Sequence, residues 1–185
     1  MKKTVWTFGL IAGAILSVMM LATIPLENGM GFDRAEIVGY TSMVVAFLLI
    51  FFGIRSYRDN VGGGRISFGR ALAVGSLITV VASACYVATW EFIFYKITPD
   101  FFTKYEAYKV EQAKAKGATQ VEIDKQIADM KRFSDLYKKN PLVNVAVTFV
   151  EPLPVALLIT LVSAGVLSRG RRRGPVAGVT ALSSQ

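Results

Sequence analysis

The chain has 185 residues, of which 53% are hydrophobic and 18% charged, and its formal net charge is +8. It contains no histidine and a single cysteine, Cys85. The absence of histidine excludes Ser-His-Asp and Cys-His nucleophile pairs, two-His metal motifs and His-ligated haem. One cysteine cannot form a disulfide within the chain. We therefore expect no catalytic residues, no cofactor and no metal site.

Four apolar blocks are long enough to cross a hydrocarbon layer of about 30 Å, which takes roughly 20 helical residues. Helices are the expected form, because an open strand in lipid leaves backbone donors and acceptors unpaired. The predicted spans are residues 4–26, 37–54, 71–95 and 142–167. The fold prediction is an all-α, polytopic membrane protein over residues 1–168, with four antiparallel transmembrane helices in one bundle.

The first block also has features of a signal peptide, because Lys2 and Lys3 precede it. Its apolar run is longer than the hydrophobic region of most signal peptides, and no small-x-small cleavage pattern follows Met20. We therefore expect a retained span.

Basic residues beside the spans set the orientation of a membrane protein, with more of them on the cytoplasmic side. The two sides of this chain carry nearly equal numbers of Lys and Arg. Lys2 and Lys3 precede the first span and only Arg34 follows it, and the first helix usually dominates. We expect both termini in the cytoplasm.

Small residues recur at four-residue spacing in three of the predicted spans. They are Gly9, Gly13 and Ser17; Ala71, Gly75, Thr79 and Ser83; and Ala156, Thr160 and Ala164. In lipid such stripes allow two helix backbones to approach closely. They are compatible with a bundle within one chain and with a homo-oligomer.

Residues 96–141 form a polar insert between the third and fourth spans, which we predict to be an extracytoplasmic helical hairpin broken near Gly117. Thr119 and Glu122 have the spacing of a capping box at the start of the second helix. One face of that helix is apolar, and its residues are Ile123, Ile127, Met130, Phe133 and Tyr137. The first helix of the hairpin, the outer surface of the bundle or a partner protein from the membrane or periplasm would cover this face.

Glu151 is the acid that hydropathy would least predict, since it lies within the fourth apolar block, just before prolines at positions 152 and 154. An ionisable group in the hydrocarbon usually has a partner or a function. If the span begins at Leu142, Glu151 lies near mid-membrane beside carbonyls freed by Pro152 and Pro154, as in transporter cation sites. If the helix begins near Val150 instead, Glu151 lies in its first turn.

Two further acids, Glu36 and Glu91, belong to the same predicted outer half as Glu151. Arg34 is the only nearby cation on the short outer loop. These residues predict either a cluster that binds protons or cations, or a static pair between Arg34 and Glu91 that fixes helix register.

The tail, residues 169–185, begins with a basic cluster. Its arginines, which we expect to contact anionic lipid headgroups, are Arg169, Arg171, Arg172 and Arg173. The positive net charge is therefore explained by membrane placement, and no nucleic-acid partner is expected. The residues after Gly174 are small and polar, which predicts disorder.

Several motifs together resemble a known family. They are Glu36-Ile37-Val38-Gly39-Tyr40-Thr41-Ser42-Met43, Phe52-Gly53-Ile54, Tyr57-Arg58-Asp59, Gly64-Arg65-Ile66-Ser67-Phe68-Gly69-Arg70-Ala71, Tyr86, Trp90, Pro99-Asp100-Phe101 with Tyr105, and Phe149-Val150-Glu151-Pro152. This pattern resembles the domain-of-unknown-function 4199 family of small bacterial membrane proteins. The resemblance implies a four-span protein of the bacterial inner membrane with unassigned activity, and no catalytic residues transfer from it.

The sequence favours two functions, ahead of a membrane enzyme that would have to rest on carboxylates and tyrosines alone for acid–base catalysis. The first is a non-enzymatic structural, assembly or partner-binding component that uses the hairpin, as its apolar face suggests. The second is a small cation- or proton-coupled transport component that uses the intramembrane carboxylates and prolines.

Overall fold

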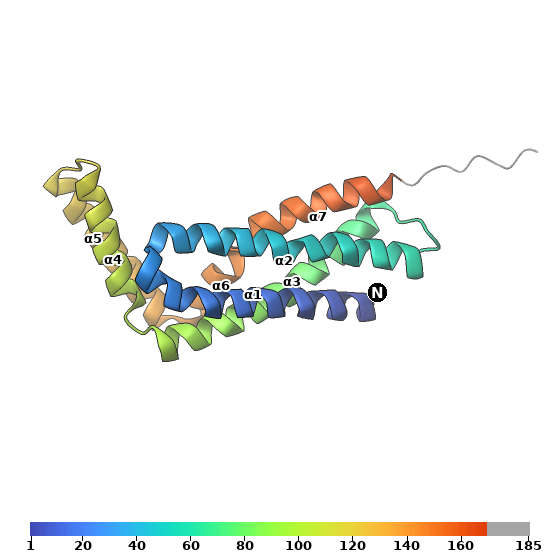
Figure 1. Ribbon diagram of the computed structural model, residues 1–185, viewed down its shortest axis with the longest axis horizontal. Coiled ribbons are helices and arrows are strands. Elements are labelled where there is room, and N and C mark those ends of the chain that lie inside the picture. The colour runs from blue at the N-terminus through green and yellow to red at the C-terminus, as the bar shows by residue number, and fades with distance from the viewer. Residues whose placement is uncertain (170–185) are drawn as a thin grey trace, which may run out of the picture.

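The computed structural model describes residues 1–169, without the side chains of residues 25–30. Within this part of the chain there is no strand, which confirms the all-α prediction (Figure 1). The helices are α1 Lys2–Met30, α2 Phe32–Asn60, α3 Phe68–Phe92, a π-helical continuation η1 Ile93–Ile97, α4 Phe101–Ala115, α5 Gln120–Lys139, α6 Pro141–Val150 and α7 Leu153–Ser168. Arg171, Arg172 and Arg173 lie outside the described residues.

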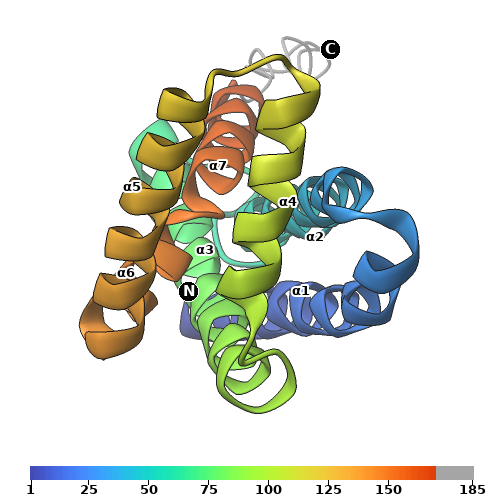
Figure 2. The ribbon, with the colours of Figure 1, turned by 90° about the vertical axis from the view of Figure 1, so that its left-hand side faces the viewer.

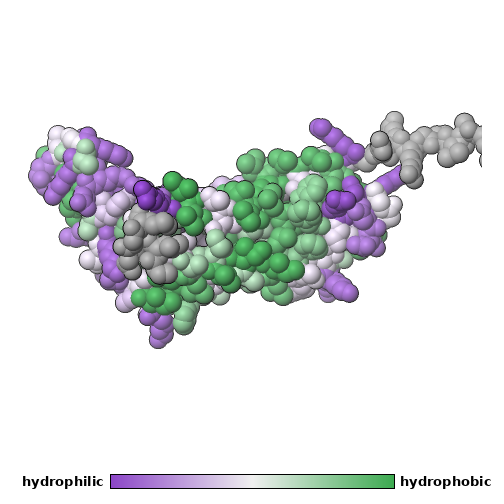
Figure 3. Space-filling view, viewed as in Figure 1, coloured by the Kyte–Doolittle hydropathy of each residue, from purple (hydrophilic) through white to green (hydrophobic). Residues whose placement is uncertain are grey.

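Four helical stretches are long and apolar enough to cross a membrane, as predicted: Lys2–Ile24, Phe32–Asn60, Phe68–Ile97 and Pro141–Ser168. An apolar belt covers the middle of the molecule, with hydrophilic surface toward both ends (Figure 3). The second helix is longer than the predicted 37–54. Its backbone hydrogen bonding continues past the apolar run, so that Arg55 and Asp59 form an ion pair one turn apart, 3.7 Å between Nε and Oδ2.

The bundle is packed through the small residues that the sequence singled out. A Cβ added to Gly9 would lie 2.7 Å from the Val81 side chain, and one added to Gly13 would lie 2.6 Å from that of Cys85. Gly75 of α3 makes the same close approach to Thr160 of α7. These stripes are therefore used inside the chain, between α1 and α3 and between α3 and α7.

The two ends of the bundle differ in what they carry. The N-terminus, the α2–α3 loop and the end of α7 lie at one end, which we call the N-terminal end (Figure 1). The α4–α5 hairpin lies across the opposite end, which we call the hairpin end (Figure 2). The basic residues Lys2, Lys3, Arg65 and Arg169 thus share one end.

The fourth span is broken in two. α6 ends at Val150 and α7 begins at Leu153, because Pro152 and Pro154 supply no backbone N–H for the carbonyls of Thr148 and Val150. α7 packs against α2 and α3, whereas α6 packs against α3 and α5. Glu151 lies in this break, because α6 ends one residue before it and α7 begins two residues after it. It is therefore neither inside a continuous helix nor in the first turn of the later one.

The hairpin is built as its sequence indicates. Thr119 and Glu122 form the predicted capping box, and Gly117 has a positive φ of 77° in the turn between the two helices. Ile123 and Tyr137 are buried, and Phe102 of α4 packs against Phe133 and Tyr137 of α5. Much of the apolar face of α5 is thus covered within the chain.

Candidate functional site: a cavity between the bundle and the hairpin

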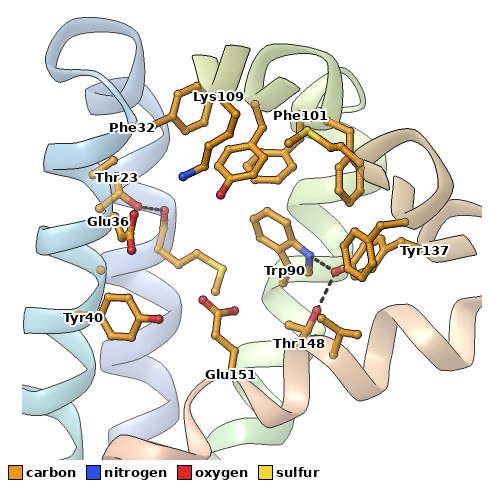
Figure 4. A pocket seen from close by; sticks show the side chains of 18 of the residues that line it. Thr23, Phe32, Glu36, Tyr40, Trp90, Phe101, Lys109, Tyr137, Thr148 and Glu151 are labelled. Atoms are coloured by element: carbon orange, nitrogen blue, oxygen red, sulfur yellow. Dashed lines mark hydrogen bonds between the residues drawn. The ribbon is translucent and has the colours of Figure 1, made fainter. Parts of the chain in front are cut away.

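A cavity of about 1020 Å³ lies at the hairpin end (Figure 4). Its walls come from α1, α2, α3 and α6 of the bundle, and α4 and α5 cover it. The cavity exists because the break in the fourth span directs its first piece, α6, toward α3 and α5. Of the two pieces of this span, α7 is the one that packs against α2. Pro152 and Pro154 therefore shape the cavity indirectly, by interrupting the backbone of the fourth span.

Glu151 borders this cavity at the helix break. Its Oε2 accepts a hydrogen bond of 3.0 Å from the hydroxyl of Tyr86 on α3. Its other oxygen makes no hydrogen bond to the described residues, and the side chain is exposed to the cavity. Glu151 therefore has one oxygen held by the protein and one available to a ligand.

The structure brings only some of the predicted polar residues together. Glu36 of α2 lines the same cavity as Glu151, while Glu91 does not, and Glu91 Oε1 is buried without a hydrogen-bond partner. Arg34 is exposed, and within residues 1–169 it forms no ion pair with Glu91 or any other described acid. The static pair between Arg34 and Glu91 is therefore not formed. Of the two prolines, Pro152 is buried and Pro154 exposed.

The rest of the wall is mainly apolar and aromatic. The aliphatic part comes from α1 and α2, with Leu16, Met19, Met20 and Met43. The aromatic part comes from α2, α3 and α4, with Tyr40, Trp90, Phe101 and Tyr105. Methionine side chains adapt to ligands of different shape, and aromatic faces accept both apolar groups and cations.

Lys109 of α4 directs its ammonium group toward the cavity (Figure 4). The Nζ atom lies 5.2 Å from the centre of the Tyr105 ring and 5.5 Å from that of Tyr108. These are cation–π distances. The upper part of the cavity thus already holds one cation of the chain against aromatic rings.

A hydrogen-bonded chain attaches α5 to the bundle beside the cavity. Trp90 Nε1 donates to the Tyr137 hydroxyl at 2.8 Å, and this hydroxyl lies 2.8 Å from Thr148 Oγ1 of α6. Thr148 in turn donates to Asn144 at 3.4 Å. Burial raises the pKa of Tyr137, so its hydroxyl stays neutral. Periodicity predicted the apolar ring of Tyr137, but its hydroxyl partners lie on two other helices, Trp90 on α3 and Thr148 on α6.

A second set of contacts holds α4 to the start of α2, and it was not predicted from the sequence. Tyr108 donates a hydrogen bond to Asp33, and Gln112 donates to the same carboxylate at 3.4 Å. Phe32 packs edge-on against Tyr105, 5.7 Å between ring centres. The hydrogen bond to Asp33 raises the pKa of Tyr108 to about 12. Nothing in the sequence around Asp33 indicates that a tyrosine far along the chain would bind it.

The predicted partner face on α5 is divided between the inside of the protein and the cavity. Ile123 and Tyr137 are buried, Ile127 is partly buried, and Phe133 is 43% exposed. Met130, Phe133 and Tyr137 line the cavity. Within the described residues no cluster of three or more acidic, His or Cys side chains is suited to hold a metal ion.

Comparison with known proteins identifies a family. Residues 7–169 match the family model described as "Protein of unknown function (DUF4199)". No curated protein and no solved structure matches the chain. Because the match covers most of the chain, including all four spans and the hairpin, the chain belongs to the DUF4199 family.

Proposed function

We propose that this protein is a non-enzymatic membrane protein that binds a small organic ligand in the cavity at the hairpin end. The observation that carries the proposal is the cavity itself, about 1020 Å³, with a mainly apolar and aromatic wall toward the bundle and most of its charged groups on the hairpin. Ligand pockets are typically a few hundred to about 1000 Å³ and have this composition. A bundle that served only as a scaffold would have no reason to keep such a space.

The arrangement of the hairpin supports ligand binding over docking of a protein partner. Two residues of the predicted partner face, Ile123 and Tyr137, are buried inside the chain. Met130 and Phe133 face the cavity that the hairpin covers. The apolar face of α5 thus serves as a roof, and little of it is left for an external protein.

The two tryptophans of the chain offer a direct test. Trp90 lines the cavity, whereas Trp6 lies on α1 near the N-terminal end and is 57% exposed. The Trp6→Phe variant therefore reports on the cavity alone, and Trp90→Phe serves as its matched control. Both would be placed in lipid nanodiscs and titrated with a neutral dodecanol that carries a nitroxide quencher.

We expect saturable quenching of Trp90 at low probe concentration. Quenching of Trp6 should rise only in proportion to the probe dissolved in the lipid. Equal, unsaturable quenching of both tryptophans would contradict the proposal, because the probe would then reach Trp90 only through the bilayer.

Cation- or proton-coupled transport is the second candidate, and the helix break favours it. Glu151 lies between two half-helices beside the freed carbonyls of Thr148 and Val150, a pattern used by transporters. The half of the bundle toward the N-terminal end is tightly packed, since Ile50 and Ile78 are fully buried there. Passage of a cation or proton therefore requires that half to open. Proton flux into proteoliposomes that is lost in Glu151→Gln would support transport, and unchanged flux would exclude this role of Glu151.

We further infer that the hairpin faces outward and the termini face the cytoplasm of a bacterial inner membrane. The two ends carry nearly equal numbers of basic residues, so the first helix is what supports this orientation. Lys2 and Lys3 precede it, only Arg34 lies on the short loop after it, and the first helix usually dominates. Lipids of both leaflets then surround the apolar belt. Protease added outside sealed spheroplasts should cleave near Gly117, and cleavage after Arg169 instead would reverse this orientation.

A further inference from the structure

We propose that the ligand is an organic cation, an amine or quaternary ammonium compound with an apolar body, and that Glu36 and Glu151 receive its charged group. This inference rests on the proposed ligand-binding function and names its substrate class. It follows from the charges, the aromatic rings and the depth of the cavity.

The charges that face the cavity are unevenly distributed. The bundle helices contribute the carboxylates of Glu36 and Glu151, and none of the described lining residues on α1, α2, α3 or α6 is basic. The described lining residues of the hairpin, which forms the roof, carry charges of both signs, with Lys109 and Lys125 beside Glu122 and Asp129. The lower part of the cavity is therefore negative wherever these carboxylates are ionised.

The aromatic residues suit the same class of ligand. Tyr40 and Trp90 line the part of the cavity that contains Glu151 (Figure 4), and Tyr86 lines it as well, with its hydroxyl 3.0 Å from Glu151 Oε2. Ammonium groups bind to aromatic faces, and cages of such rings recognise quaternary ammonium compounds. Lys109, whose Nζ lies 5.2 Å from the Tyr105 ring centre, shows that rings of this cavity are placed to contact a cation.

The depth of Glu151 makes a cationic partner the best match. Glu151 is hydrogen-bonded to Tyr86, which lies well inside the membrane-spanning stretch Phe68–Ile97. A carboxylate at that depth is costly without a partner, and within the described residues no basic side chain pairs with it. A neutral or anionic ligand leaves Glu151 unpaired, whereas an ammonium group supplies the missing charge.

The test compares three probes that differ only in head group. They are dodecyl chains with trimethylammonium, hydroxyl or sulfate heads, each with a nitroxide on the same carbon, titrated into Trp6→Phe protein in nanodiscs of neutral lipid. We expect half-saturation of Trp90 quenching at a concentration roughly tenfold lower for the ammonium probe than for the alcohol. The sulfate probe should bind most weakly.

Two substitutions locate the effect. In the Trp6→Phe background, Glu151→Gln should abolish the preference for the ammonium probe and leave binding of the alcohol unchanged. Glu91→Gln removes an equivalent carboxylate that does not line the cavity, and it should retain the preference. Glu36→Gln should weaken the preference and carries the test if Glu151→Gln fails to fold.

The outcomes separate this inference from the function on which it rests. Equal binding of ammonium and alcohol probes would overturn the cation assignment and leave ligand binding intact. Strongest binding of the sulfate probe would also overturn it and would point to Lys109 and Lys125. Unsaturable quenching by all three probes would overturn both proposals.

Discussion

The half of the bundle toward the N-terminal end and the half toward the hairpin end are built from similar apolar helices, but one has a packed interior and the other a cavity. At the N-terminal half, α7 packs against α2 and α3, and Ile50, Ile54 and Ile78 are fully buried. At the hairpin half, α6 leaves α2, and a cavity with Glu36 and Glu151 takes the place of a packed core. Both halves are made of apolar helices of similar composition.

The difference shows that one backbone break decides whether such a bundle is solid or hollow. Pro152 and Pro154 interrupt the fourth helix. Its second piece, α7, packs against α2, whereas its first piece, α6, packs against α3 and α5 instead. The solid half supplies the close helix contacts, and the hollow half is held by a few polar and aromatic contacts of the hairpin. Substitutions in the two halves should therefore have different kinds of effect.

The largest effect is expected in the solid half, from Gly75→Val. A Cβ at Gly75 would lie 2.6 Å from Thr160 Cγ2 and 3.1 Å from Ile50 Cγ2, so α3 and α7 would have to separate. We expect a loss of about 3 kcal/mol in the free energy of unfolding, the upper end for overpacking. Gly165→Val is the matched control on α7, because no atom lies within 4 Å of its added Cβ. Equal unfolding curves in detergent for the two variants would show that this half is not tightly packed.

A smaller, local effect is expected in the hollow half, from Tyr137→Phe. The substitution leaves the partly buried Trp90 N–H without its acceptor at 2.8 Å and removes the bond to Thr148. We expect α5 to become about 2 kcal/mol less protected in hydrogen exchange, while α7 is unchanged. Tyr95→Phe is the control, since that ring is 47% exposed. A loss of protection spread over all four spans would contradict the division into two halves.

The same residue predicts a pH dependence. Burial raises the pKa of Tyr137 above its usual value of about 10. The stability contributed by the neutral hydroxyl is therefore complete below about pH 10 and is lost as the pH rises through the higher folded pKa. Protection of α5 should fall in alkaline solution in the wild type, and Tyr137→Phe should lack this transition. An identical alkaline transition in both proteins would assign it to another group.

The smallest effect is expected at the tip of the hairpin, from Thr119→Ala. This change removes one member of the capping box and should cost about 1 kcal/mol, confined to the first turn of α5. The backbone N–H and hydroxyl of Thr119 hold the pKa of Glu122 below its usual value of about 4.3. The stability from this box is complete above that value and is lost as the pH falls through the folded pKa. Hydrogen exchange at pH 7 and pH 3 should show this difference in wild type and a smaller one in Thr119→Ala, whose backbone N–H still donates to Glu122.

Local patterns predicted the features that depend on neighbouring residues. The four spans followed from long apolar runs, the capping box from the spacing of Thr119 and Glu122, and the close helix packing from Gly9, Gly13 and Gly75. The disturbance of the helix near Glu151 followed from the two prolines. Each of these is a property of a few residues in one segment.

The partners of the polar groups could not be predicted in this way. The pairing of Arg34 with Glu91 was a reasonable choice from charge alone, but the structure places Tyr86 against Glu151 and Tyr108 against Asp33. Each of these bonds joins residues more than sixty positions apart. Which side chains meet at that separation depends on how each helix is rotated and tilted in the bundle.

Hydropathy along the chain is thus enough to predict a four-span helical protein, because the cost of exposing backbone polar groups to lipid leaves helices as the solution. The helical hairpin follows from its own local signals, the break at Gly117 and the capping box of Thr119 and Glu122. Only the packing of the helices decides that α6 turns away from α2 at Glu151, and that the hairpin closes over the space left behind. That space arises from the relative placement of six helices, and no single segment encodes it.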